Sequence, residues 1–270
     1  MHLSKIKHSK FNESGQLLVF YVLSVAWSFA LMHEDDYIGN FHKLWDAYPH
    51  NALTWRTKMF MIVQMSYWLH WYPELYLQKV KKEELADRIT YISLYFVAVV
   101  GAYFMSFSPL AVVLLSIHYL GEAIFQATRL VYFAEKNVIA RYGFMVWNLM
   151  FPIVRLIISG MAIFILFLRL EATVVPRIDF NSGNFNTRGI RLVCLAFIVL
   201  TQMWLLYRFV TFFLRHRRER SSRKSTKKTL KATPKPVKTS EEEEESANEN
   251  SSSQITSNGT ATGVTTRRRK

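Results

Sequence analysis

Four polar side chains recur at helical spacing inside one long apolar stretch, residues 110–133. They are His118, Glu122, Gln126 and Arg129, each three or four residues from the next. At about 100° per residue in an α-helix they fall within a sector of about 80°, so one face of the predicted helix is polar and the rest is apolar. A histidine beside a glutamate can transfer protons, but one such pair is weak support for general acid–base catalysis.

The stretch that carries these residues is long enough to cross a membrane. At about 1.5 Å per residue, residues 110–133 span a hydrocarbon core of about 30 Å. A polar face is costly against lipid, so it must point into protein or a water-filled cavity. We therefore predict that the four side chains border an intramembrane polar groove.

Arg155 is a second deep cation, in the middle of the apolar stretch 144–168. It is too far from either end for its side chain to reach the headgroups, so we predict that it faces the bundle interior and has a partner. Glu122 is the acid that suits this role. Such a pair either holds two helices together or lines a polar cavity that is open to a substrate or a passing peptide. The polar side chains of Gln64, His70 and Gln202 are predicted to hydrogen-bond between helices.

Six apolar stretches predict the elements that position these residues. Only helices or closed barrels satisfy the backbone in lipid, and the stretches lack the alternation of a barrel. The fold class is therefore all-α: a polytopic transmembrane helix bundle over residues 17–214, with a disordered basic tail. The predicted spans are residues 17–32, 57–77, 89–107, 110–133, 144–168 and 190–214.

The distribution of Lys and Arg predicts the orientation of the bundle. The net charge is +14, and the cations gather in the N-terminal segment 1–16, after the second and fourth spans, and in the tail. By the positive-inside rule, these parts and both termini are cytosolic. The three arginines of the 169–189 loop conflict with this orientation. No small-residue cleavage site follows residues 17–32, so we expect this stretch to stay in place as a signal anchor.

The C-terminal segment 215–270 is polar and is predicted to be disordered. It begins with a basic cluster, continues with the five glutamates Glu241–Glu245, and ends in a Ser/Thr/Asn-rich stretch. The cluster is either a topology determinant or a contact for anionic lipid or the phosphates of ribosomal RNA. The segment has no aromatic residue to stack on bases, and we expect no DNA partner. The cluster consists of Arg215, Arg217, Arg218, Arg220, Arg223, Lys224, Lys227 and Lys228.

Other signatures of chemistry are missing from the sequence. The eight histidines are scattered without His-x-x-His spacing, and Cys194 is the single cysteine. There is no Gly-rich phosphate loop and no G-x-S-x-G motif. We therefore predict no metal, no cofactor and no enzymatic activity.

Several segments resemble the translocating-chain-associated membrane proteins, whose TLC (TRAM/LAG1/CLN8) domain is shared with ceramide synthases. The resemblance covers about residues 1–215 and includes the central LLSIHYLGEAIFQATRLVYF. That family has two further spans and a glycosylated lumenal loop before the point that corresponds to Met1, so the resemblance implies an N-terminally shortened form. The other matching segments are HSKFNESGQL (8–17), AYPHN (47–51), YWLHWYPELYLQKVKKEE (67–84) and DFNSGNFN (179–186).

Comparison with the catalytic relatives argues against acyl transfer. In ceramide synthases the equivalent helix carries a His-Asp pair, a second Asp, a Glu and a Lys, and a His-His pair precedes it. His118 keeps the histidine, whereas Tyr119, Glu122, Gln126 and Arg129 replace the other four. No histidine occurs between His70 and His118. The polar stripe therefore resembles a scaffold that has lost its catalytic partners.

The resemblance implies a multi-pass protein of the endoplasmic reticulum membrane, located beside the Sec translocon. Such a protein contacts signal sequences and nascent chains and assists their translocation or membrane insertion. Two alternatives remain open. One is a non-catalytic protein that binds or regulates membrane lipids, with a lipid between spans 4 and 5. The other is a tether whose basic tail holds ribosomes or anionic membrane.

Overall fold

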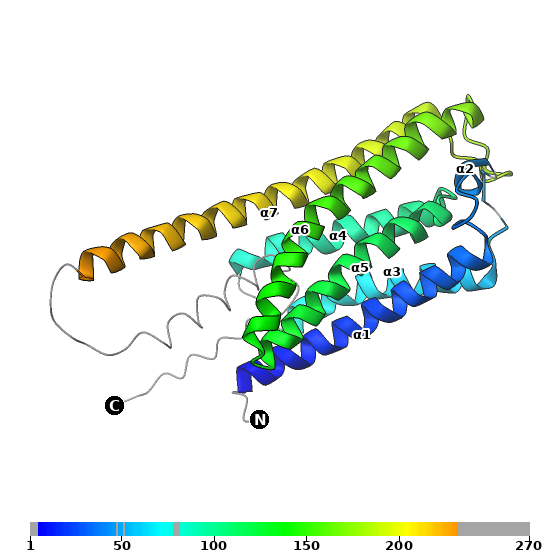
Figure 1. The fold of residues 1–270 in the computed structure, drawn as a ribbon. Coiled ribbons are helices and arrows are strands. Elements are labelled where there is room, and N and C mark those ends of the chain that lie inside the picture. Colours follow the sequence, from blue (N-terminus) through cyan, green and yellow to red (C-terminus); the bar gives the residue numbers. More distant parts are fainter. Residues whose placement is uncertain (1–4, 47, 51, 78–81, 232–270) are drawn as a thin grey trace.

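The computed structural model describes residues 5–46, 48–50, 52–77 and 82–231, and it contains no β-strand within these ranges (Figure 1). This confirms the all-α prediction. The helices are α1 (Lys5–Glu34), α2 (Lys43–Asp46), α3 (Trp55–Leu77), α4 (Lys82–Phe104), α5 (Ser108–Phe133), α6 (Asn137–Ala162) and α7 (Arg188–Lys231). A π-helical segment η1 (Ile163–Arg169) and a 3-10 turn η2 (Leu170–Thr173) continue α6.

Five helices of the described chain are long and apolar enough to cross a membrane. They are α1, α4, α5, α6 with its continuation, and α7. Helix α3 has 23 residues and corresponds to the second predicted span, residues 57–77, but it is not among the five. Its many Trp and Tyr rings, together with Gln64, His70 and Glu74, make it less apolar than the others. The structure is a polytopic helix bundle.

The first and last helices extend beyond the predicted spans. Helix α1 begins at Lys5 rather than near residue 17, and α7 continues to Lys231 rather than ending near residue 214. The early start of α1 has a packing reason, since Ser14, Leu17 and Tyr21 follow one helical face and are all buried. Along α7, Lys and Arg are good helix formers and no proline interrupts them. Residues 232–270 of the predicted tail lie outside the described part.

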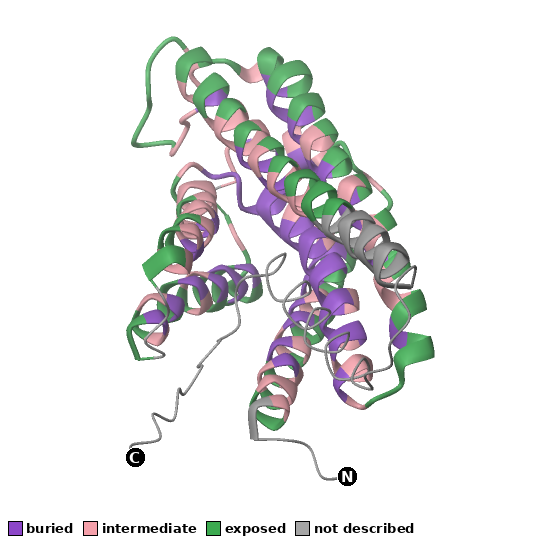
Figure 2. Ribbon diagram, turned by 90° about the vertical axis from the view of Figure 1, so that its left-hand side faces the viewer, coloured by how far each residue is buried: buried purple, intermediate pink, exposed green. Residues whose placement is uncertain are grey.

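Helix α5 lies at the centre of the bundle. In its most apolar part 61% of the residues are buried, against at most 39% in the other four membrane-length helices (Figure 2). The close approach of α5 to α6 depends on Gly143 of α6, because a Cβ there would meet the hydroxyl oxygen of Thr128 on α5 at 2.6 Å. Polar residues on α5 are therefore surrounded by protein on most sides.

The two ends of the bundle are built differently. At one end, which we call the loop end, the connections α1–α3, α4–α5 and α6–α7 meet. The Tyr48 hydroxyl donates to the Met105 carbonyl at 3.1 Å and accepts from the Phe185 amide at 3.2 Å, and the Ser106 hydroxyl donates to the Gly183 carbonyl at 3.3 Å. Helix α1 begins and α7 ends at the opposite end (Figure 1).

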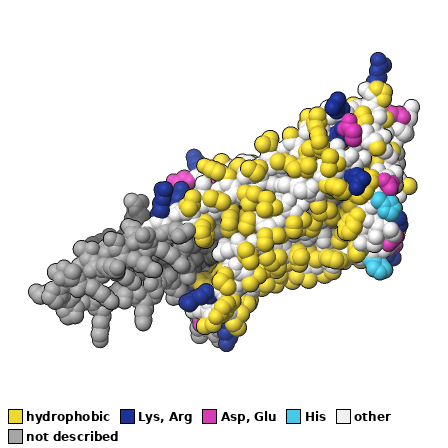
Figure 3. Space-filling view, turned by 45° about the horizontal axis from the view of Figure 1, so that its top comes forward, with side chains coloured by type: hydrophobic (Ala, Val, Ile, Leu, Met, Phe, Trp, Pro, Cys, Tyr) yellow, Lys and Arg dark blue, Asp and Glu magenta, His cyan; other side chains and the backbone are white. Residues whose placement is uncertain are grey.

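The surface of the bundle matches this arrangement. Figure 3 shows a band of hydrophobic side chains along the helices, with charged side chains gathered towards the two ends. An apolar girdle of this kind faces lipid, while the charged ends face water and headgroups.

Candidate functional site

The polar stripe of α5 points into the bundle. His118, Glu122, Gln126 and Arg129 are each at most 5% exposed, and Arg155 of α6 is 1% exposed. Helical spacing places the four α5 residues on one face, and the neighbouring helices cover it. The stripe is an internal cluster in this structure rather than an open groove.

Arg155 is the centre of this cluster. Its Nη1 donates to the Tyr95 hydroxyl at 2.9 Å and to Gln202 Oε1 at 3.2 Å. Its Nη2 lies 2.9 Å from His118 Nδ1 and 4.0 Å from a Glu122 carboxylate oxygen. Glu122 and Arg155 therefore lie as far apart as an ion pair allows. The shorter contacts of Arg155 are with three uncharged side chains, on α4, α5 and α7.

His118 has both of its ring nitrogens engaged. Arg155 can only donate, so Nδ1 accepts and the proton of a neutral ring sits on Nε2. That Nε2 lies 3.4 Å from the Tyr91 hydroxyl. The ring also stacks on Tyr95, with centroids 4.5 Å apart and planes 17° apart. These contacts leave the imidazole no free nitrogen with which to accept a proton from a substrate.

Aromatic side chains extend the cluster across the bundle to α1. Trp68 stacks on Tyr95 at 4.7 Å and donates through Nε1 to the Tyr119 hydroxyl at 3.2 Å. Tyr119 in turn donates to Gln64 Oε1 at 2.7 Å, and Gln64 Nε2 donates to the Ser24 hydroxyl at 3.3 Å. Gln64 and Gln202 form the predicted interhelical hydrogen bonds. His70 does not, because its side chain is exposed and lies 3.4 Å from the Glu74 carboxylate of the same helix. The aromatic members give no polar signal within an apolar stretch, and the sequence did not predict them.

Gln126 and Arg129 are separated from the Arg155 contacts. The guanidinium of Arg129 lies 5.8 Å from the Phe125 ring centroid and 5.6 Å from that of Phe133. In the described part of the chain, Gln126 Oε1, Arg129 Nε and Arg155 Nε are buried and have no hydrogen-bond partner. Buried polar atoms of this kind are costly, so the stripe retains capacity for water or for the polar group of a guest.

The other predicted groups are placed as follows. The basic cluster belongs to the final part of α7, where Arg215 and Arg218 are exposed and the other six side chains lie outside the described set. Among the described residues, no group of three or more His, Cys, Asp or Glu is placed to hold a metal ion.

These features define the chain as a polytopic helical membrane protein whose central helix, α5, carries a buried polar face. Residues 10–211 match the TLC domain of the TRAM, LAG1 and CLN8 proteins, and the chain belongs to this family.

Within this family, the chain is similar to translocating chain-associated membrane protein 2. It is 41% identical to the protein of Mus musculus over 236 residues and to that of Homo sapiens over 235. Each comparison covers 87% of this chain, and the chain spans 63% of the length of each relative. These matches confirm the predicted resemblance.

Proposed function

We propose that this protein resides in the endoplasmic reticulum membrane, contacts signal sequences and nascent chains beside the Sec translocon, and assists their translocation or insertion. The observation that carries the proposal is the 41% identity, over 87% of the chain, to proteins named for association with translocating chains. Both termini face the cytosol in this proposal. The distribution of Lys and Arg supports that orientation, and so does the position of the α1 start and the α7 end at one end of the bundle.

The buried cluster suggests how such a contact is made. A signal sequence has a basic flank and an apolar core, and lipid can accept the core. Glu122 would attract the flank, and the free Gln126 Oε1 would accept a hydrogen bond from it. Arg155 limits the negative charge that the site presents. Because these side chains are almost fully buried, a guest reaches them when neighbouring helices separate.

The protein performs this role without catalysis in our proposal. Both His118 nitrogens are occupied, and Glu122 lies beside a cation. A general base needs a free lone pair within reach of its substrate, and His118 offers none, while the Glu122 carboxylate is buried.

Site-specific photocrosslinking tests the proposal. Ribosome–nascent chain complexes carry one photoreactive residue, either in the basic flank or in the apolar core of the signal sequence, and are targeted to microsomes that contain the full chain. We expect crosslinks from flank positions, and weaker ones with Glu122→Gln. Glu135→Gln is the matched control, since Glu135 is exposed just after α5 and should leave the crosslinks unchanged.

Absence of a crosslink at every probe position would overturn the proposed function. Crosslinks that persist unchanged in folded Glu122→Gln would retain the function but reject the cluster as the site of contact. The thermal unfolding midpoint of each variant shows whether it is folded.

A further inference from the structure

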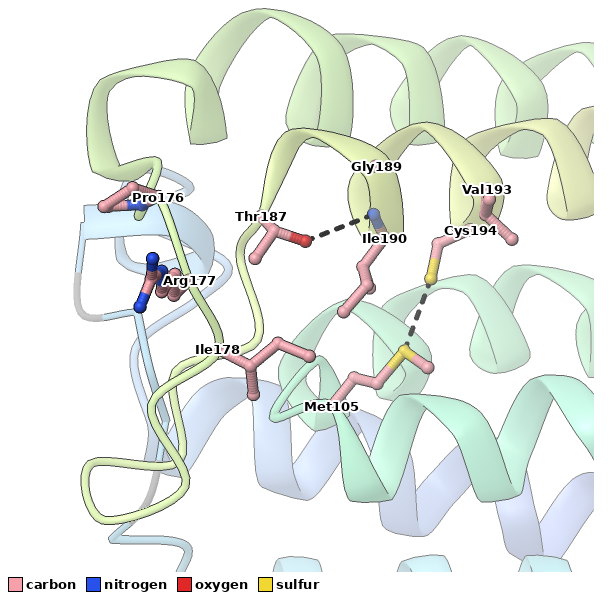
Figure 4. A pocket seen from close by; sticks show the side chains of 9 residues that line it. All are labelled: Met105, Pro176, Arg177, Ile178, Thr187, Gly189, Ile190, Val193 and Cys194. Carbon is pink, nitrogen blue, oxygen red and sulfur yellow. Dashed lines mark hydrogen bonds between the residues drawn. The ribbon is translucent and has the colours of Figure 1, made fainter.

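A second feature, separate from the polar cluster, lies at the loop end. A cavity of about 630 Å³ opens between the end of α4, the segment 176–178 and the first turns of α7 (Figure 4). Its volume is within the range of about 300–1,000 Å³ that is typical of small-molecule sites. Its walls are formed mainly by the apolar side chains of Met105, Ile178, Ile190, Val193 and Cys194.

The cavity lies where the membrane-spanning helices end. Met105 directly follows the last residue of α4, and Ile190 to Cys194 belong to the first two turns of α7. Ile178 is 40% exposed and Val193 is 69% exposed, so the apolar wall continues onto the outer surface. At this depth hydrocarbon gives way to headgroups, and lipid is the neighbour that such a surface meets.

One charged residue lines the cavity. Of the nine described residues around it, Arg177 alone is ionised, and its side chain is exposed. The nearby carboxylate of Asp179 is engaged within its own turn, where it accepts from the Asn181 amide at 2.9 Å and from the Ser182 hydroxyl at 2.6 Å. Arg177 is therefore available to an anion, and a guanidinium suits a phosphate.

The lining also disfavours a peptide backbone as the occupant. An extended peptide brings amide groups that need hydrogen-bond partners when buried. The hydroxyl of Thr187 accepts from the Ile190 amide at 3.3 Å and keeps a single O–H to donate (Figure 4). Apart from Arg177 and the weakly polar thiol of Cys194, the other lining side chains are apolar. The lining thus suits an apolar chain with a single anionic group at its mouth.

We propose that this cavity binds an anionic glycerophospholipid of the surrounding leaflet, with an acyl chain against Met105, Ile178 and Val193 and the phosphate at Arg177. The site is distinct from the polar cluster of α5, and the proposal does not depend on the translocation role.

Cys194 provides the readout, because it is the one cysteine of the chain, is partly exposed and lines the cavity. The full chain is placed in nanodiscs of phosphatidylcholine alone or with added phosphatidylglycerol, and the rate of alkylation by N-ethylmaleimide is measured. We expect alkylation to be about tenfold slower with phosphatidylglycerol. This is the factor that results when lipid occupies about nine-tenths of the sites and only the empty sites react. N-ethylmaleimide is uncharged, so the surface charge of the bilayer does not alter its local concentration.

Two variants separate the site from a general effect of the bilayer. Arg177→Gln should abolish the dependence on phosphatidylglycerol. Arg188→Gln is the matched control, since Arg188 is an exposed arginine at the start of α7 that does not line the cavity, and it should keep the dependence. Native mass spectrometry provides a second measurement, in which the wild type retains phosphatidylglycerol and Arg177→Gln does not.

Equal alkylation rates in the two bilayers would overturn the proposal. So would protection that persists in Arg177→Gln. Protection of Cys194 by a synthetic signal peptide in phosphatidylcholine, without protection by phosphatidylglycerol, would assign the cavity to a peptide instead.

Discussion

Arg155 connects α6 to three other helices through one guanidinium. It contacts Tyr95 on α4, His118 and Glu122 on α5, and Gln202 on α7. A buried cation is tolerated only when hydrogen bonds and a nearby acid replace its hydration. The arginine is thus costly to bury, and its contacts fix how these four helices meet.

Replacing Arg155 with alanine should strongly destabilise the protein. The change leaves the Glu122 carboxylate buried without its cation and Gln202 Oε1 without its donor, so we expect a loss of about 3–5 kcal/mol in the free energy of unfolding. Unfolding in detergent, followed by circular dichroism, measures the effect. Arg141→Ala removes an exposed cation of the same helix and should change stability by at most about 0.5 kcal/mol. Equal stabilities of the two variants would contradict the role given to Arg155.

At the residue scale, the sequence predicts charged members of the cluster better than aromatic ones. A deep arginine and a deep glutamate stand out in apolar stretches, so their proximity is predictable, and the structure places them 4.0 Å apart. The shorter hydrogen bonds of Arg155 to Tyr95 and His118 depend on which helices pack side by side. Tyrosine is common in membrane helices for other reasons, so Tyr95 gives no signal before the packing is known.

The environment of His50, at the loop end, predicts that the folded protein loses stability in mild acid. Burial lowers the pKa of His50 below its ordinary value of 6.5, and the hydrogen bond with the Leu44 carbonyl only partly opposes this. The unfolded chain therefore takes up the proton at a higher pH than the folded chain does. The stabilising contribution of neutral His50 is complete above about pH 6.5 and falls as the pH drops through the lower folded-state pKa.

Unfolding midpoints measured from pH 7.5 to pH 5 test this prediction. The wild type should lose stability over this range, and His50→Gln should lose less because it does not titrate. His42→Gln, at an exposed position of the same connection, should follow the wild type. Parallel pH profiles for the wild type and His50→Gln would refute the assignment.

At the element scale, the close crossing of α5 and α6 depends on Gly143. A Cβ at this position would meet Thr128 Oγ1 at 2.6 Å and Thr128 Cγ2 at 2.7 Å. The Thr128 hydroxyl is held by its hydrogen bond to the Ile124 carbonyl at 2.8 Å, so the side chain cannot simply rotate away. Gly143→Ala should therefore cost about 1–3 kcal/mol through overpacking.

Gly160 of the same helix is the matched control. A Cβ there meets nothing within 4 Å, and alanine is the better helix former, so Gly160→Ala should be neutral or stabilising by about 0.5–1 kcal/mol. In the double variant Gly143→Ala with Thr128→Ser, the Thr128 methyl group is absent. This variant should recover part of the stability lost in Gly143→Ala. Equal effects at the two glycines would show that helix propensity rather than the crossing decides stability.

The extents of the helices were predictable where apolar residues end, and not where polar residues continue a helix. The apolar pattern locates the central stretch 110–133 closely, and α5 runs from Ser108 to Phe133. Hydropathy does not show that Lys5 already belongs to α1 or that α7 reaches Lys231. These extensions arise from packing against the bundle and from helix propensity, neither of which a hydropathy pattern contains.

At the scale of the whole molecule, the arrangement predicts which connections share a side of the membrane. Phe180, which is 78% exposed, belongs to the loop end, and Lys136 belongs to the turn between α5 and α6 at the opposite end. In a Cys194→Ser background, we expect Phe180→Cys to react with a membrane-impermeant maleimide only after microsomes are permeabilised. Lys136→Cys should react in intact microsomes. Reaction of both cysteines in intact microsomes would contradict the bundle topology.

In the proposed function, the chain assists the passage of signal-bearing proteins through the translocon. The most direct test uses proteoliposomes that contain purified Sec translocon with or without the full chain, and measures the fraction of a secretory precursor that becomes protease-protected. We predict a higher fraction with the wild-type chain, a smaller gain with Glu122→Gln and the full gain with Glu135→Gln. Equal protected fractions with and without the chain, for every precursor in a panel that varies the length of the basic flank, would contradict the proposed function.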